Sequence, residues 1–162
     1  MMRRIIFILV LICSAQGLYS QRLTTTFSND LSRWRFEGNT FQTVFSNDLD
    51  RWSYDGIQVK TTFSNNQNNW QIGSNYKLST VFNNDFDSWE ITGNGDHVRI
   101  RTTFNNDFER WDISGDIDGT IRTVFSKDFQ KWEIELEDEE SIDPELKAAV
   151  VFIAIFTAFT NK

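Results

Sequence analysis

The chain has 162 residues, with 16 lysines and arginines against 23 aspartates and glutamates, and a formal net charge of −7. This acidic balance argues against nucleic acid or anionic lipid as the main partner, because both carry the same sign of charge. The single cysteine excludes an intramolecular disulfide, and the length suits one domain with a substantial core.

The first twenty residues have the organisation of a secretory signal peptide. Two arginines precede the apolar run 5–12, and small or weakly polar residues follow it. The run is too short to cross a bilayer as a helix. We therefore expect residues 1–20 to be a signal peptide, cleaved after Gly17 or after Ser20, and the mature protein to be extracytoplasmic, either periplasmic or secreted.

Between residues 21 and 137 one phrase of about ten residues occurs six times. The interval from its Phe to its Trp never changes, whereas the interval from each Trp to the next Phe does. A loop of fixed length therefore alternates with one of variable length. The repeated residues are Phe27, Trp34, Phe45, Trp52, Phe63, Trp70, Phe82, Trp89, Phe104, Trp111, Phe125 and Trp132.

Apolar and polar residues alternate on both sides of each fixed loop. Ile100, Thr102 and Phe104 share one parity, and Trp111 is followed two residues later by Ile113. A period of two with β-branched and aromatic residues predicts strands with one buried face. On this parity we expect the six Phe and the six Trp to form the core. Each repeat then supplies two strands of about five to seven residues, a usual length.

The fixed loop contains residues typical of turns. An Asp or Asn side chain can accept a hydrogen bond from the backbone N–H two residues further on. The third copy carries Gln67 where the others have Leu or Phe, so we expect it to close less well. We assign the loop-structuring role to Asp30, Asp48, Asn66, Asp85, Asp107 and Asp128.

Two copies of this loop, 126–132 and 46–52, resemble the S-x-D-[LF]-x-x-W hairpin in the blades of five-bladed propeller glycoside hydrolases. They are also similar, one residue shorter, to the Asp-box hairpin of sialidase-type propellers. The resemblance covers seven residues per copy and implies a hairpin geometry but no catalytic residue. A propeller blade needs four strands and about 40 residues, roughly twice the length of these repeats.

The C-terminal part predicts an acidic linker over 138–143 and a helix over 144–160. Asp143 suits the N-cap and Pro144 the first helical position. Residues 148–159 are apolar except for Thr157, which indicates a helix buried on all sides. The apolar stretch is shorter than the roughly 20 residues that cross a bilayer.

These two parts fit one architecture. Six hairpins present an apolar face that needs a cover, and a twelve-stranded barrel has an interior wide enough for a helix. We predict an all-β fold with one C-terminal helix, in which an antiparallel meander of about twelve short strands curls like a barrel around that helix. A propeller or a two-sheet sandwich is the alternative.

The sequence contains no nucleophile motif, phosphate-binding loop or metal-ligand spacing, so we expect no enzymatic activity, no cofactor and no metal. The carboxylates of the fixed loops recur in equal settings, whereas catalysis needs carboxylates in unlike ones. We therefore look for binding residues at positions where the sequence of one repeat differs from that of the others. In the two longest variable loops these are Asn94, Asp96, His97, Asp116 and Asp118.

We thus expect an exported, non-catalytic repeat protein that acts as a structural or protein-interaction scaffold. A carbohydrate-binding module is the alternative, because the fixed loops are rich in Asn, Asp and aromatic residues. Membrane association through the apolar C-terminal helix is a lesser one. The sequence does not identify the partner: a protein and a glycan are both open, no nucleic acid is expected, and a membrane is disfavoured.

Overall fold

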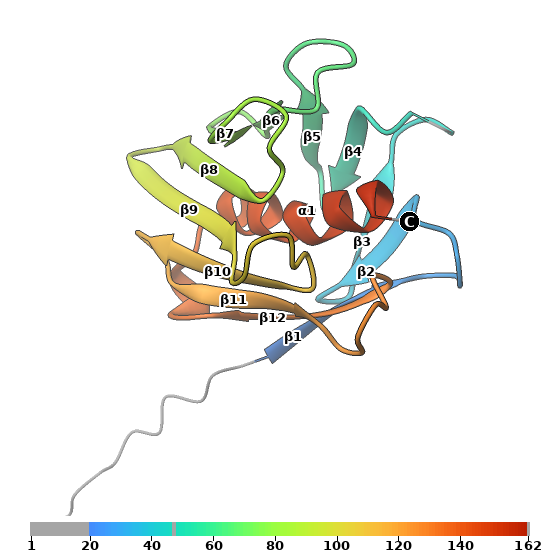
Figure 1. Ribbon diagram of the computed structural model, residues 1–162. Coiled ribbons are helices and arrows are strands. Elements are labelled where there is room, and N and C mark those ends of the chain that lie inside the picture. The colour runs from blue at the N-terminus through green and yellow to red at the C-terminus, as the bar shows by residue number, and fades with distance from the viewer. Residues whose placement is uncertain (1–19, 47, 162) are drawn as a thin grey trace, which may run out of the picture.

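A computed structural model describes residues 20–46 and 48–161; the expected signal peptide lies outside these ranges except for Ser20. Twelve strands form one closed antiparallel barrel around a single long helix (Figure 1). The strands pair in chain order, and β1 pairs with β12 to close the ring. The predicted meander around a C-terminal helix is confirmed, and the propeller and sandwich alternatives are wrong.

Each repeat contributes one strand before its fixed loop and one after it. The strands before the loops are β1 (Ser20–Thr25), β3 (Asn39–Thr43), β5 (Ile57–Thr61), β7 (Tyr76–Thr80), β9 (Asp96–Thr102) and β11 (Gly119–Thr123). The strands after the loops are β2 (Arg33–Phe36), β4 (Arg51–Tyr54), β6 (Asn69–Ile72), β8 (Ser88–Gly93), β10 (Arg110–Gly115) and β12 (Lys131–Leu136). A short 3-10 helix, η1 (Glu139–Ser141), and the helix α1 (Pro144–Thr160) complete the chain.

The meander gives the barrel two ends. The six fixed loops form one end, which we call the fixed-loop mouth. The variable turns between β2 and β3, β4 and β5, β6 and β7, β8 and β9, and β10 and β11 form the other, which we call the turn mouth. The helix α1 begins at the turn mouth and ends at the fixed-loop mouth.

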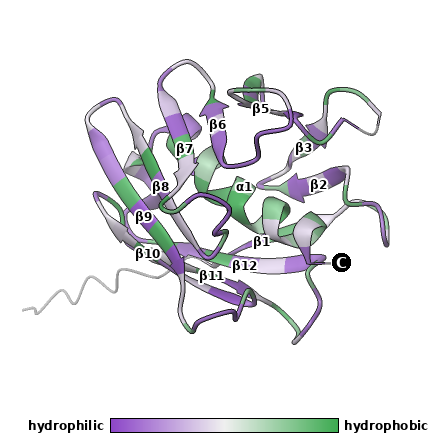
Figure 2. Cartoon of the chain, turned by 45° about the horizontal axis from the view of Figure 1, so that its top comes forward, coloured by the Kyte–Doolittle hydropathy of each residue, from purple (hydrophilic) through white to green (hydrophobic). Residues whose placement is uncertain are grey.

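The core lies between the inner face of the barrel and α1 (Figure 2). All six tryptophans are completely buried, as predicted. The ring centroids of Trp70 and Phe152 lie 4.6 Å apart, and those of Trp89 and Phe156 lie 5.0 Å apart. Every residue of α1 from Ala148 to Ala158 is buried, so the helix is enclosed on all sides, as its composition indicates. No helix in the described ranges is long and apolar enough to cross a membrane.

The prediction that the six repeated phenylalanines form the core is wrong. Phe27, Phe45, Phe63, Phe82, Phe104 and Phe125 are between 56% and 67% exposed. Alternation along the sequence predicts which face a side chain lies on only while the strand stays paired. In the first repeat the pairing of β1 with β2 ends where Thr25 pairs with Trp34. The chain then turns, and a residue later in the loop points inward instead. These inner residues, which pack against the core, include Leu31, Phe86, Phe108 and Phe129.

The turn mouth holds the beginning of α1. The Asp143 carboxylate accepts a hydrogen bond of 2.8 Å from the backbone N–H of Glu145, which confirms the predicted N-cap. The Glu145 carboxylate in turn accepts from the backbone N–H groups of Ser74 (3.2 Å) and Asn75 (2.9 Å) in the turn between β6 and β7. Gly73, at a φ of +54°, leaves the space that this carboxylate occupies.

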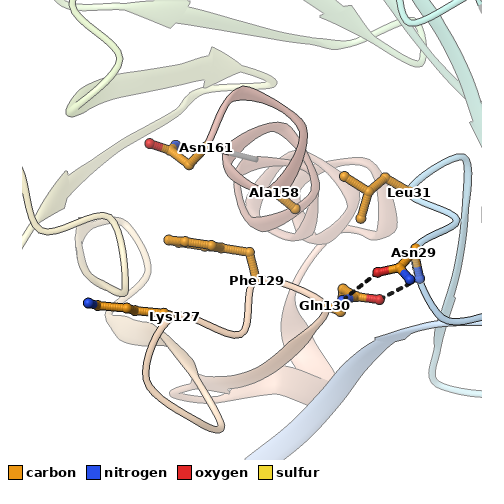
Figure 3. A pocket seen from close by; sticks show the side chains of 7 residues that line it. All are labelled: Asn29, Leu31, Lys127, Phe129, Gln130, Ala158 and Asn161. Atoms are coloured by element: carbon orange, nitrogen blue, oxygen red, sulfur yellow. Dashed lines mark hydrogen bonds between the residues drawn. The ribbon is translucent and has the colours of Figure 1, made fainter.

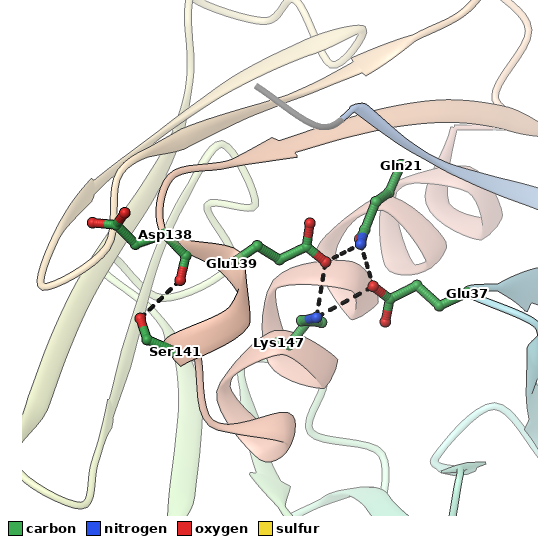
Figure 4. Close-up of polar contacts among 6 residues, drawn as sticks. All are labelled: Gln21, Glu37, Asp138, Glu139, Ser141 and Lys147. Carbon is green, nitrogen blue, oxygen red and sulfur yellow. Dashed lines mark hydrogen bonds and ion pairs between the residues drawn. The ribbon is translucent and has the colours of Figure 1, made fainter. Parts of the chain in front are cut away.

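A polar cluster beside the helix start shows that residues 138–143 are more than a linker (Figure 4). Lys147 Nζ lies 2.9 Å from a Glu139 oxygen and 3.2 Å from a Glu37 oxygen, and the Gln21 amide donates to both carboxylates. Burial would lower the pKa of Lys147, but its hydrogen bonds to Glu139 and Glu37 raise it overall. Burial, and then the hydrogen bond with Glu139, raise the pKa of Glu37. The cluster thus joins β1, the β2–β3 turn, η1 and α1.

Candidate functional site

Each fixed loop is closed by the same pair of hydrogen bonds. The backbone carbonyl of the Phe accepts from the backbone N–H three residues on, and that residue's carboxylate or amide oxygen accepts from the N–H two residues further, at 2.9 to 3.3 Å. The predicted loop-structuring role is confirmed in all six copies: Asp30, Asp48, Asn66, Asp85, Asp107 and Asp128. The third copy closes like its siblings, with a distance of 3.1 Å from Asn68 N to Asn66 Oδ1, so the expectation of poorer closure is wrong.

The residue before each of these acceptors adopts the left-handed conformation in the described copies. The φ angles lie between 59° and 63° at Asn29, Asn65, Asn84, Asn106 and Lys127. Asn tolerates this conformation better than most side chains do. Lys127 is the exception, since it bears the steric cost that its siblings avoid. The predictions from sequence overlooked this position, although the recurring Asn before the Asp indicates it.

The tryptophans are committed to the fold by their polar atoms as well as by their burial. Each indole N–H donates to the backbone carbonyl of the loop residue three positions earlier, at 2.8 to 3.2 Å in all six copies. A buried indole N–H needs such a partner. The tryptophans are therefore occupied in the core and cannot stack on a ligand from outside.

Neighbouring fixed loops are joined by hydrogen bonds. The residue two positions before a Trp accepts from the backbone N–H of the left-handed residue in the next loop. The pairs are Asp50 Oδ2 with Asn65 (3.2 Å), Asn68 Oδ1 with Asn84 (2.7 Å), Glu109 Oε1 with Lys127 (2.8 Å) and Gln130 Oε1 with Asn29 (2.7 Å). The last pair connects the sixth repeat to the first, so these bonds join the second, third and fourth loops to one another, and likewise the fifth, sixth and first.

The fixed-loop mouth carries six exposed aromatic side chains, one per repeat, which we call the phenylalanine rim: Phe27, Phe45, Phe63, Phe82, Phe104 and Phe125. The Arg51 guanidinium lies 6.0 Å from the Phe45 ring centroid, and Lys131 Nζ lies 5.7 Å from that of Phe125. In both cases a cation at the start of the following strand thus lies over the ring. The residue after each Phe is an exposed Ser or Asn: Ser28, Ser46, Ser64, Asn83, Asn105 and Ser126.

The candidates from the variable loops lie at the turn mouth, where the contacts of several of them shape the turns. Asp96 accepts a hydrogen bond of 2.5 Å from the Tyr76 hydroxyl; burial, and then this bond, raise the pKa of Tyr76. Asp116 Oδ2 accepts from the backbone N–H of His97 at 2.6 Å, so these two residues are brought together. The His97 ring is exposed, with Nε2 3.8 Å from Glu90.

The other two candidates have backbone roles. Asn94 occupies a left-handed turn position at a φ of 51°, and the Asp118 carbonyl accepts from the backbone N–H of Glu137 at 3.0 Å. In the part of the chain that the structure describes, no three His, Cys, Asp or Glu side chains are placed to hold a metal ion. These five residues thus provide turn geometry and an exposed His.

A hollow of about 480 Å³ opens at the fixed-loop mouth where the first and last repeats meet (Figure 3). Leu31, Phe129 and Ala158 supply its apolar lining, and Asn29, Lys127, Gln130 and Asn161 supply its polar lining. The predictions from sequence did not include this site. Its one sequence trace is Lys127, which stands where every other copy has Asn.

Comparison with protein-family models, curated proteins and solved structures gives no match to this chain.

Proposed function

We propose that this protein is an exported, non-catalytic scaffold that binds another protein through the phenylalanine rim. The rim is the observation that carries the proposal. The loop Asp and Asn residues, the tryptophans and the inner Leu and Phe residues each have a role in folding. The rim phenylalanines are mostly exposed in every copy, although a smaller polar side chain could occupy the same place in the turn.

The size of the rim suits a protein partner. A buried aromatic side chain covers about 150–250 Å². Six rings that are about 60% exposed thus offer on the order of 500–900 Å², close to the roughly 800 Å² per partner of a standard interface. Adjacent repeats are two strands apart, about 9–10 Å, so polar atoms separate the rings. Separate anchors among polar contacts are typical of binding hot spots.

The hydrogen bonds between loops reduce the cost of binding. Ordering a loop upon association costs conformational entropy, and a surface that is already fixed avoids much of this cost. The pairs from Asp50–Asn65 to Gln130–Asn29 hold neighbouring loops together before a partner arrives. The rim therefore resembles a prepared contact surface more than a set of separate loop tips.

The proposal is tested by replacing every second rim residue, with Phe45→Ser, Phe82→Ser and Phe125→Ser together. The control changes three exposed residues of the outer wall, Thr40→Ser, Gln58→Ser and Lys77→Ser. Cross-linking in the native extracytoplasmic fraction should yield a partner with the wild type and the control but not with the rim variant. Equal yield from the rim variant would contradict docking at the rim.

Two further measurements test the other parts of the proposal. N-terminal sequencing of protein recovered outside the cytoplasm should begin at Leu18 or Gln21. A screen of the pure protein for hydrolase activity should find no turnover above background, and robust turnover would overturn the non-catalytic assignment.

Membrane association through α1 has no support, because the barrel encloses the helix.

Carbohydrate binding is the second candidate function. The hollow between the first and last repeats favours it, together with the exposed Ser or Asn beside each rim Phe. A glycan array separates the candidates, since a protein scaffold leaves the array blank. Glycan binding without a protein partner would favour the second candidate.

A further inference from the structure

We propose that the hollow between the first and last repeats binds one uncharged sugar ring of a glycan. The inference rests on carbohydrate binding, the second candidate function, but it uses residues distinct from the phenylalanine rim. It assigns the ligand to Phe129, Ala158 and the carboxamides around them.

The hollow exists because the last turn of α1 fills the mouth unevenly. The Phe159 ring stacks on Trp52 with centroids 5.9 Å apart, and Phe156 lies 5.0 Å from Phe86. Both aromatic side chains thus lean toward the second to fourth repeats. Toward the sixth and first repeats the helix presents only Ala158, whose methyl group leaves the space open.

The lining combines the two features that a sugar ring needs. Phe129 and Leu31 offer apolar surface to the C–H face of the sugar. The side chains of Asn29, Gln130 and Asn161 are carboxamides, which both donate and accept hydrogen bonds, as vicinal hydroxyl groups require. A volume of about 480 Å³ falls within the roughly 300–1,000 Å³ of small-molecule sites, with room for one or two rings.

Part of this lining is held in place before a ligand binds. Gln130 Oε1 accepts from the backbone N–H of Asn29 at 2.7 Å, and Gln130 Nε2 lies 3.5 Å from Asn29 Oδ1. At the helix end, Asn161 Nδ2 donates to the Thr157 carbonyl at 3.1 Å. Figure 3 shows the Gln130–Asn29 pair on one side, and Phe129 and Lys127 extending to the other.

Charge indicates an uncharged ligand. Among the residues that the structure describes, no carboxylate lines the hollow, which disfavours a cation. Lys127 is the one charged residue in the lining as far as residues 20–46 and 48–161 show, and its backbone N lies 2.8 Å from a Glu109 carboxylate oxygen. The chain as a whole carries a net charge of −7, which repels an anionic polymer. The Lys127 ammonium is then a hydrogen-bond donor at the edge.

The repeats themselves supply variants that should fold. Phe129→Leu installs the residue found at Leu31 and Leu49, removing the aromatic platform, and Ala158→Leu fills the hollow with a good helix former. Lys127→Asn restores the side chain of the other copies. The matched control is Phe108→Leu, the same change in a repeat that does not line the hollow.

The test is a titration of the full mature protein with methyl glycosides of neutral hexoses and of hexuronic acids, followed by amide chemical shifts. Thermal midpoints confirm that each variant is folded. We expect a neutral glycoside to shift the side-chain amides of Asn29, Gln130 and Asn161. Phe129→Leu and Ala158→Leu should weaken binding at least about tenfold, the effect of losing one good contact, whereas Phe108→Leu should change it less than about threefold.

Three other results would overturn the proposal, and they are distinguishable. Preference for the hexuronic acid, lost in Lys127→Asn, would contradict the uncharged ligand. Neutral sugar binding that survives Phe129→Leu but is lost in the triple rim variant would move the site to the rim and leave carbohydrate binding standing. The absence of shifts with every glycoside would overturn both the site and carbohydrate binding, while the protein scaffold is judged by its own cross-linking test.

Discussion

The two mouths of the barrel are closed in different ways. At the fixed-loop mouth six nearly identical loops each close themselves, four hydrogen bonds link neighbouring loops, and an aromatic side chain is left exposed in every copy. At the turn mouth the contacts occur once each: Lys147 with two glutamates, and Glu145 with the turn before β7. Repetition therefore builds a surface, whereas the unique contacts fix where the helix begins. The expectations below test this division.

The largest expected effect can be tested in the third repeat, where, as in every copy, a buried and an exposed aromatic residue lie seven positions apart. Trp70→Ala should lower the free energy of unfolding by about 3–5 kcal/mol, because it empties a site that is completely buried against Phe152. Phe63→Ser, at a side chain that is 66% exposed, should change it by less than about 0.5 kcal/mol. Chemical denaturation of both variants measures the difference, and a comparable loss in both would show that the rim is structural.

The turn mouth should respond to the loss of its lysine. Lys147→Met leaves Glu37 and Glu139 facing each other without a cation. We expect a loss of about 2 kcal/mol, below the roughly 3–5 kcal/mol for a fully buried pair, because the glutamates are partly exposed. Lys60→Met, on the outer wall, is the control and should cost less than about 0.5 kcal/mol. Equal stability of the two variants would mean that the cluster does not hold the helix.

A single loop of the fixed-loop mouth should depend on its turn-forming carboxylate. Asp128→Ala removes the acceptor that lies 3.0 Å from the Gln130 backbone nitrogen and should cost about 1 kcal/mol. Asp128→Asn keeps an acceptor oxygen, as Asn66 does in the third copy, and should be nearly neutral. The denaturation midpoints of the Asp128→Ala and Asp128→Asn variants measure the two effects. If Asn is as damaging as Ala, the negative charge and not the hydrogen bond is what the loop requires.

The sequence was sufficient for the parts of the molecule that repeat or that follow local rules. Alternation predicted the strands, the constant spacing predicted the loops, and the Asp143-Pro144 pair placed the start of α1. The sequence did not predict the exposure of the rim phenylalanines. Alternation tells which side of a sheet a side chain faces only within a paired strand, and in the first repeat the pairing ends at Thr25. The sequence did not predict the Lys147 cluster or the hollow, for another reason. Both join residues that are far apart in the chain, such as Glu37 with Lys147 and Asn29 with Gln130.

The smallest expected effect is a difference in the sign of pH dependence between the mouths. At the turn mouth, burial and Glu139 raise the pKa of Glu37 above its ordinary value of 4.5. The folded state then binds this proton more tightly than the unfolded state does. The contribution of Glu37 to stability is therefore complete below pH 4.5 and is lost as the pH rises through the raised pKa.

At the fixed-loop mouth the sign is opposite. Hydrogen bonds from the Ser32 hydroxyl and backbone N–H lower the pKa of Asp30 below its ordinary value of 3.8. Stability from Asp30 is present above pH 3.8 and is lost as the pH falls through the lowered pKa. The opposite signs can be measured as thermal midpoints from pH 7 to pH 2 for the wild type and two variants. Relative to Glu37→Gln, the wild type should gain stability as the pH falls toward 4.5; relative to Asp30→Asn, it should lose stability below 3.8. Curves that run parallel to the wild type in both variants would show that neither carboxyl group distinguishes the mouths.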